Sequence, residues 1–201
     1  MTWYVNDLKV SHNDQSVVDE IIKKINDRFG GLITTNGKEH TYLGMKIKYN
    51  DDRTVSINMS EYIEETIDVF SEVSKISPGA TTPAKQNLFD VDEDSKRLDT
   101  KRSNLFHHCT ANLLYVSKRC RLDIALTISF LCSRVSCSSE EDWLKLKRLL
   151  RYLYRTKEPI LTIGGDNMSV VGVFVDSLYA VHPNMVSHIG ACISFGRVPL
   201  L

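Results

Sequence analysis

The residues of this sequence that most directly suggest chemistry lie within its first twelve positions. The stretch WYVNDLKVSH, residues 3–12, places the polar pair Asn6-Asp7 between two short apolar runs. Two adjacent carboxylates at the tip of a β-hairpin present oxygen atoms to divalent metal ions, as phosphoryl transfer requires. Asn6-Asp7 supplies one carboxylate, and both residues also tolerate the positive φ of an ordinary type I′ turn. Taken alone, the stretch favours a plain turn, and a metal-binding turn is the alternative.

A second candidate site is the basic stretch WLKLKRLLRYLYRTK, residues 143–157. On a helix, Arg148, Arg151 and Arg155 share one face, opposite most of the leucines. Residues 101–157 carry 12 Lys and Arg against 4 Asp and Glu, although the net charge of the whole chain is zero. The same segment contains Lys118, Arg119 and Arg121. A solvated amphipathic helix and a surface that binds nucleic-acid phosphates are the two interpretations.

The other titratable residues give weaker evidence for a functional site. His107 and His108 are adjacent, so on a helix their side chains diverge by about 100° and do not form a metal site. Asp176 ends the apolar run VVGVFV, which is where a strand reaches water and also where a metal-dependent nuclease places a carboxylate. The five cysteines are scattered and form no CxxC pair, so neither a disulfide framework nor a zinc site is indicated.

The elements that would position these residues follow from their periodicity. Asp14 is expected to cap a helix that ends at Gly30-Gly31. Strands are expected over 42–50, with Gly44 inside the strand at a bulge or a close backbone approach, and over 54–59. Further helices are predicted over 60–75, 103–119, 122–135 and 139–156, the last with a capping-box-like start at Ser139 and Asp142. Strands are predicted again over 170–177 and 187–196.

The order of these motifs resembles one family, the reverse transcriptases of copia-type LTR retrotransposons. WYVNDLKVSH resembles their tyrosine-x-Asp-Asp hairpin, and YLGMKI (42–47) the leucine-glycine strand that grips the primer. SEYIEETI (60–67) is similar to the first thumb helix, followed by Thr82-Pro83. Residues 113–131 resemble the block that usually contains Arg-Pro-Asp-Ile, here Arg-Leu-Asp-Ile at 121–124. Residues 143–157 match the Lys-Arg-x-Leu-Arg-Tyr-Leu element, and residues 174–196 the first two strands of ribonuclease H.

The resemblance implies an α+β fold in three parts. Residues 1–59 are expected to form the C-terminal part of a palm, 60–157 a helical thumb or connection, and 158–201 the first strands of a ribonuclease H-like domain. The resemblance places Tyr4, Leu43 and Gly44, together with the basic residues named above, beside an RNA or DNA template–primer. The remainder of a Pol polyprotein is a further expected partner.

The resemblance also implies Mg²⁺ binding at two places, the hairpin turn of the polymerase and the ribonuclease H domain. We expect that neither place binds Mg²⁺ productively in this chain. The catalytic positions are Asn6, Asp7 and Asp176, with Asp7 and Asp176 as metal ligands. Asn6 replaces the first Asp of the turn and offers a neutral carbonyl oxygen in place of a carboxylate, a poor Mg²⁺ ligand. The family's upstream Asp and its later ribonuclease H carboxylates have no counterpart in the sequence, so both activities are expected to be absent.

Two alternatives to a degenerate polymerase fragment stay open at this stage. One is a non-catalytic module that binds nucleic acid through residues 101–157. The other is the product of a decayed element without a selected function. No apolar run approaches the ~20 residues that span a bilayer, and no signal-peptide pattern precedes the first strand. We therefore expect a cytoplasmic or nuclear protein without a membrane partner.

Overall fold

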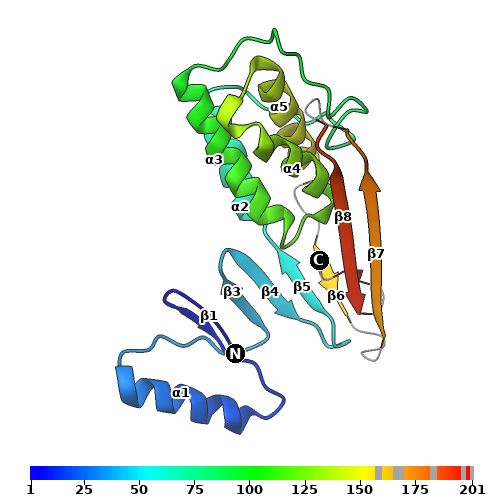
Figure 1. Cartoon of the computed structure of the whole chain (residues 1–201). Helices are drawn as coiled ribbons and strands as arrows, with labels where there is room; N and C mark the ends of the chain where they lie inside the picture. Colours follow the sequence, from blue (N-terminus) through cyan, green and yellow to red (C-terminus); the bar gives the residue numbers. More distant parts are fainter. Residues whose placement is uncertain (157–159, 165–169, 182–184, 196–197, 200–201) are drawn as a thin grey trace.

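The protein is an α+β chain with its helices in one body and its strands in antiparallel sheets (Figure 1). The structure, a computed structural model, describes residues 1–156, 160–164, 170–181, 185–195 and 198–199. The main helices gather at one end and a four-stranded sheet lies at the middle. The first hairpin and α1 lie at the other end, and two long strands run along the side. This architecture confirms the predicted α+β class.

The hydrophobic core lies among α2 (Ser60–Ser71), α3 (Thr100–Ser117), α4 (Ala125–Ser133) and α5 (Glu140–Arg155). Apolar residues at helical spacing explain it, because they bury one face of each helix against the others. On α5 the buried residues are Leu146, Leu149, Leu150 and Leu153. Phe70 of α2 stacks on Trp143 of α5, with ring centroids 4.4 Å apart. The predicted division of α5 into a leucine face and an arginine face is confirmed.

Side-chain caps fix the starts of α5 and α3, whereas other helix boundaries differ from the prediction. The predicted capping box forms at the start of α5, where Ser139 and Asp142 bond each other's backbone N–H groups. α3 begins three residues before its predicted start, because the Asp99 side chain accepts a hydrogen bond from Arg102 N. The helix predicted over 122–135 is divided into the 3₁₀ turn η1 (Leu122–Ile124), α4, and the 3₁₀ turn η2 (Val135–Cys137). α2 ends at Ser71, four residues earlier than predicted.

A four-stranded sheet lies beneath the helices in the order β3-β4-β5-β6. Its strands are β3 (Glu39–Tyr42), β4 (Met45–Tyr49), β5 (Val55–Asn58) and β6 (Leu161–Ile163). The expectation that Gly44 lies inside a strand is wrong. Leu43 (φ 51°) and Gly44 (φ 74°) form the two-residue turn between β3 and β4, and Tyr42 pairs with Met45 across it. β6 pairs with β5, so this sheet extends across the boundary expected at residue 157.

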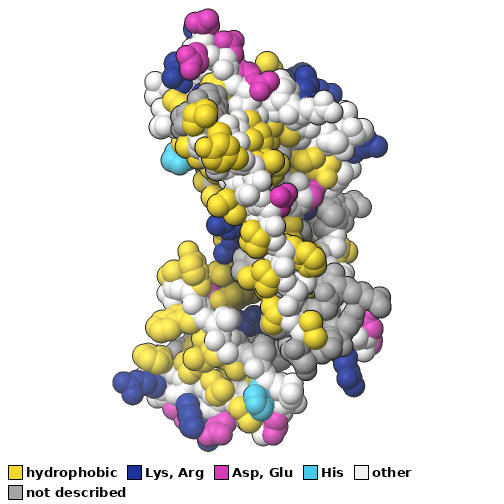
Figure 2. Space-filling view, turned by 45° about the vertical axis from the view of Figure 1, so that its right-hand side comes forward, with side chains coloured by type: hydrophobic (Ala, Val, Ile, Leu, Met, Phe, Trp, Pro, Cys, Tyr) yellow, Lys and Arg dark blue, Asp and Glu magenta, His cyan; other side chains and the backbone are white. Residues whose placement is uncertain are grey.

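The N-terminal unit consists of β1 (Thr2–Tyr4), β2 (Asp7–Lys9) and α1 (Gln15–Phe29). The Asp14 cap is confirmed, since its side chain accepts a hydrogen bond from Ser16 N. None of the residues of α1 is buried. Trp3, Phe29 and Ile33 are 76%, 74% and 97% exposed, and Figure 2 shows hydrophobic side chains at the surface of this lower part of the molecule. This unit therefore has little core of its own.

The turn of the first hairpin is displaced by one residue from its predicted position. Tyr4 pairs with Asp7, so Val5 and Asn6 occupy the tip and Asp7 belongs to β2. This register sets Trp3 opposite Leu8, and the Trp3 indole N–H donates to the Val5 carbonyl at 2.6 Å. Val5 consequently adopts φ 50°, a strained conformation for a β-branched residue.

The remaining strands form the sheet β7-β8-β9, with β7 (Val171–Leu178), β8 (His188–Phe195) and β9 (Val198–Pro199). β7 and β8 confirm the two strands predicted for this region. Their ribbon runs alongside the helices and the central sheet (Figure 1), and the His188 ring lies 5.5 Å from Phe89. Among the helices of the described residues, none is long and apolar enough to cross a membrane.

Candidate nucleic-acid interface

The cations of α5 lie against the loop that follows α2. Arg148 Nη2 donates to Thr82 Oγ1 at 2.9 Å, and Arg151 Nε donates to the Ser77 carbonyl at 3.1 Å. Lys147 Nζ donates to Ser74 Oγ at 2.9 Å. All three acceptors are neutral oxygen atoms. These hydrogen bonds orient the cations and leave their positive charge uncompensated.

A groove of about 470 Å³ opens where α5 meets this loop. Its charged lining residues are Lys85, Glu141, Lys145, Lys147, Arg148 and Arg151. Glu141 forms an ion pair with Lys145, with a distance of 3.0 Å between Oε1 and Nζ. For the other four cations, no carboxylate of the described residues lies within ion-pair distance. We call these four, Lys85, Lys147, Arg148 and Arg151, the cationic groove.

Gly79 permits the close contact between the loop and α5. A Cβ atom at this position would lie 2.6 Å from Arg151 Nη2, and φ is +157°. The Arg148 Nε–H is buried and has no hydrogen-bond partner among the described residues, so this guanidinium is incompletely satisfied. The sequence indicated Arg148 and Arg151. It did not indicate Lys85 or the loop, because their proximity to α5 depends on how the chain folds back after Pro78.

A second cluster joins the turn at Leu43-Gly44 to the end of α3. The Tyr115 hydroxyl donates to the Leu43 carbonyl at 2.7 Å, and the Arg119 guanidinium lies 3.6 Å above the Tyr115 ring. Tyr62 packs on Tyr115, and a Cβ atom on Gly44 would lie 3.3 Å from the Tyr62 ring. Burial raises the pKa of Tyr62, and the neighbouring Tyr115 and Glu65 raise it further. The fold thus brings Leu43, Gly44 and Arg119 together from distant parts of the sequence.

Arg121 is not available to a ligand, which corrects its prediction as a nucleic-acid contact. The side chain is 2% exposed and forms a bidentate pair with Asp123, at 2.8 Å to Oδ1 and 2.7 Å to Oδ2. It also donates to the carbonyl and the hydroxyl of Thr156, at 2.7 and 2.8 Å. Arg121 therefore joins the start of η1 to the end of α5.

The other predicted contact residues lie at the surface. Lys118 is exposed at the C-terminal cap of α3, and Arg155 is exposed in the last turn of α5. Tyr4, 61% exposed, lies on β1, at the end of the molecule that contains α1 and opposite helices α2 to α5. Tyr4 therefore lies apart from the cationic groove on α5.

The residues present do not fit a Mg²⁺ site. Asn6 and Asp7 line a small cavity of about 270 Å³ beside α1 and β3, whereas Asp176 is exposed on β7 and accepts a hydrogen bond from Ser177 N. These strands occupy different parts of the molecule (Figure 1). The described residues contain no group of three or more His, Cys, Asp or Glu side chains arranged to hold a metal ion. No reaction step is therefore assigned to a metal.

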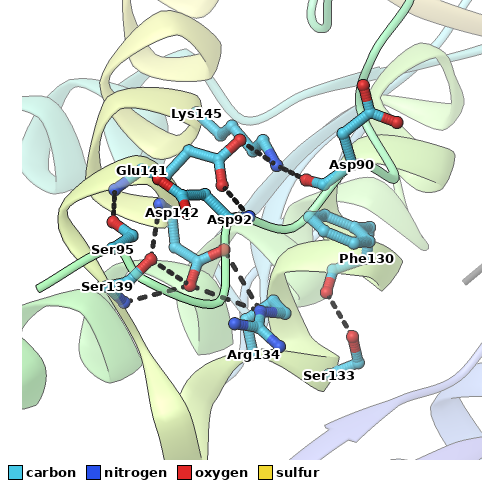
Figure 3. A network of polar contacts seen from close by, with 10 residues as sticks. All are labelled: Asp90, Asp92, Ser95, Phe130, Ser133, Arg134, Ser139, Glu141, Asp142 and Lys145. Atoms are coloured by element: carbon cyan, nitrogen blue, oxygen red, sulfur yellow. Dashed lines mark hydrogen bonds and ion pairs between the residues drawn. The ribbon is translucent and has the colours of Figure 1, made fainter. Parts of the chain in front are cut away.

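A larger cleft of about 810 Å³ lies beside the N-terminus of α5, where Arg134 and Ser139 of its lining bond Asp142 (Figure 3). Asp142, 1% exposed, accepts hydrogen bonds from Ser139 N and Oγ and from Arg134 Nε, at 3.0, 3.1 and 3.2 Å. Glu141 accepts from Asp92 N at 2.8 Å. This network holds the segment before α3 against α5, and we assign it a structural role.

No model of a known protein family matches the sequence, and no solved structure matches the fold. The cationic groove, with four cations that have no carboxylate partner among the described residues, is the feature that bears most directly on function.

Proposed function

We propose that this chain is a non-catalytic, nucleic-acid-binding fragment of a copia-type reverse transcriptase. The observation that carries the binding function is the cationic groove, whose four cations border an open groove and have no carboxylate partner in the part of the chain that the structure describes. Lys and Arg that neutralise phosphates release condensed counterions, which supplies most of the sequence-independent affinity for nucleic acid. Hydroxyl groups such as that of Thr82 add hydrogen bonds to phosphate oxygens.

Several features support the proposed lineage. The tip of the first hairpin, where Val5 adopts φ 50°, falls within the stretch that resembles the family's metal-binding turn, and backbone strain of this kind is concentrated at functional sites. The Leu43-Gly44 turn, which resembles the primer-gripping segment, lies beside Arg119. In this proposal residues 1–59 derive from a palm, 60–157 from a thumb or connection, and 158–201 from a ribonuclease H-like domain.

The apolar residues exposed on the N-terminal unit fit the same proposal. Trp3, Tyr4 and Val5 on the hairpin and Ile33 after α1 are each more than half exposed. Exposed apolar side chains that lie close together mark interaction surfaces. The partner proposed for this surface is another part of a Pol polyprotein.

Primer extension tests the loss of catalysis. We expect the chain to incorporate no nucleotide above background on a primed template with Mg²⁺ or Mn²⁺, because one carboxylate cannot hold two metal ions. Asn6→Asp is expected to remain inactive, since the described residues supply no further ligand. An active reverse transcriptase in the same buffer is the positive control. Template-dependent synthesis by the chain itself would contradict the proposal.

The salt dependence of binding tests the cationic groove. For a single-stranded oligonucleotide, Lys147→Gln/Arg148→Gln/Arg151→Gln is expected to reduce the slope of log K against log[salt] by about 2, because each phosphate contact contributes about 0.7. The matched control is Lys23→Gln/Lys24→Gln/Arg28→Gln, which removes the same charge from α1. Fluorescence anisotropy from 50 to 200 mM salt measures both slopes. Equal slopes for the two triple variants would refute the assignment, as would no binding by the unmodified chain at 50 mM salt.

A further inference from the structure

We propose that Thr82 is a phosphorylation site whose phosphate occupies the cationic groove and blocks nucleic-acid binding there. Thr82 is exposed and directly precedes Pro83, so it presents the sequence that proline-directed Ser/Thr kinases require. Its Oγ1 already accepts a hydrogen bond from Arg148 Nη2 at 2.9 Å. This inference rests on the proposed function for its consequence, while the phosphate contact itself can be measured without nucleic acid.

The groove has the chemistry of a phosphothreonine site. A phosphate group carries a charge of about −1.5 to −2 at pH 7 and three strong acceptor oxygens, and opposite a cluster of cations it forms new charge-assisted hydrogen bonds. A phosphate on Oγ1 begins within hydrogen-bond distance of Arg148. Lys85, Lys147 and Arg151 line the same groove and have no carboxylate partner among the described residues. Phosphorylation costs the loop little stability, because it removes one exposed hydrogen bond, which Thr82 Oγ1 donates to the Ala84 carbonyl.

The modification is a simple phosphoryl transfer from ATP. The Oγ1–P bond forms while the bond between the γ-phosphorus and the β,γ-bridging oxygen breaks. The hydroxyl proton passes to a base on the kinase, and ADP leaves. The product places on this chain the same group that a nucleic-acid backbone would bring to the groove. The phosphothreonine and an oligonucleotide phosphate therefore compete for the same cations.

Thr81 provides a matched control for charge. It is exposed and adjacent to Thr82, but the hydrogen bond from Arg148 Nη2 goes to Thr82, and among the described residues no hydrogen bond joins the Thr81 side chain to a cation of the groove. Chains carrying phosphothreonine at 82 or at 81 have the same net charge. By ³¹P NMR titration, the phosphate on Thr82 is expected to have a lower second pKa than the phosphate on Thr81, because nearby cations favour the dianion. Arg148→Gln should remove this difference.

Binding and kinase assays complete the test. At 50 mM salt, phosphorylation of Thr82 is expected to weaken oligonucleotide binding about tenfold relative to phosphorylation of Thr81. A proline-directed kinase with ATP should modify Thr82 of the folded chain. Equal ³¹P pKa values at the two sites would overturn the proposal, and so would modification at Ser77 alone. If the unmodified chain fails to bind the oligonucleotide, the proposed function fails, and the ³¹P comparison still decides whether the groove holds the phosphate.

Discussion

Replacing Arg121 with Met is expected to lower the free energy of unfolding by about 1–3 kcal/mol, because the Thr156 acceptors lose their buried donor while Asp123, 40% exposed, stays partly solvated. Arg121 is 2% exposed, and its guanidinium satisfies Asp123 and both oxygen atoms of Thr156. The Tyr152 hydroxyl also donates to Asp123 Oδ2 at 2.7 Å. The variant leaves this carboxylate without its cation and the end of α5 without its contact to η1. Urea denaturation followed by circular dichroism measures the change.

Two further variants show whether the ion pair is responsible. Arg121→Met/Asp123→Leu is expected to be less destabilised than Arg121→Met, because no unpaired charge is left. Arg121→Lys should lie between the wild type and Arg121→Met, since an ammonium cannot form the bidentate contact. An unfolding free energy for Arg121→Met within about 0.5 kcal/mol of the wild type, the range of ordinary surface substitutions, would show that the contact does not stabilise the fold.

The same pair gives the protein a defined dependence on pH. Burial acts to raise the pKa of Asp123, but the hydrogen bonds from Arg121 and Tyr152 outweigh it, and the pKa lies below its ordinary value. A carboxyl group with a lowered pKa in the folded state contributes stability above its unfolded pKa of about 3.9, and loses it as the pH falls through the folded value. The acid-induced loss of stability should therefore be smaller in Arg121→Met than in the wild type.

Replacing Asp142 with Ala is expected to lower the unfolding free energy by about 3–4 kcal/mol, for a related reason. The carboxylate is 1% exposed and accepts hydrogen bonds from Ser139 N, Ser139 Oγ and Arg134 Nε (Figure 3). Its removal leaves the Arg134 cation and a buried backbone N–H without this acceptor, and each carries a desolvation penalty. The reciprocal half of the capping box is lost at the same time, whereas the Ser139 hydroxyl still accepts from the backbone N–H of residue 142.

Ser139→Ala separates the contribution of the helix cap from that of the ion pair between Asp142 and Arg134. This variant removes the cap hydroxyl but retains the ion pair, so we expect a loss of about 1 kcal/mol. Asp142→Asn keeps one acceptor oxygen and should fall between the two. Thermal and urea denaturation of the three variants give the comparison. If Asp142→Ala costs no more than Ser139→Ala, the buried contact to Arg134 adds nothing to stability.

Local sequence was sufficient where one short segment contains all the determinants of a structure. The caps at Asp14 and Ser139 were predicted because a side chain bonds a backbone N–H two or three residues away. The leucine face of α5 was predicted because helical periodicity separates it from the arginines. The turns at Val5-Asn6 and Leu43-Gly44 were misplaced, because their registers depend on cross-strand pairs such as Trp3 with Leu8 and Tyr42 with Met45.

The sequence by itself determined the charge of the middle segment, the amphipathic helices and the neutral amide side chain at position 6. The tertiary structure decided which of these cations are buried and which line an open groove. In the sequence, Arg121 and Arg148 are two arginines of the same basic segment, and nothing local distinguishes them. In the structure, Arg121 is buried against Asp123, whereas Arg148 borders an open groove. The physical reason is that the availability of a charge depends on the partners that folding brings to it. Those partners, Thr156 for Arg121 and Thr82 for Arg148, lie 35 and 66 residues away along the chain.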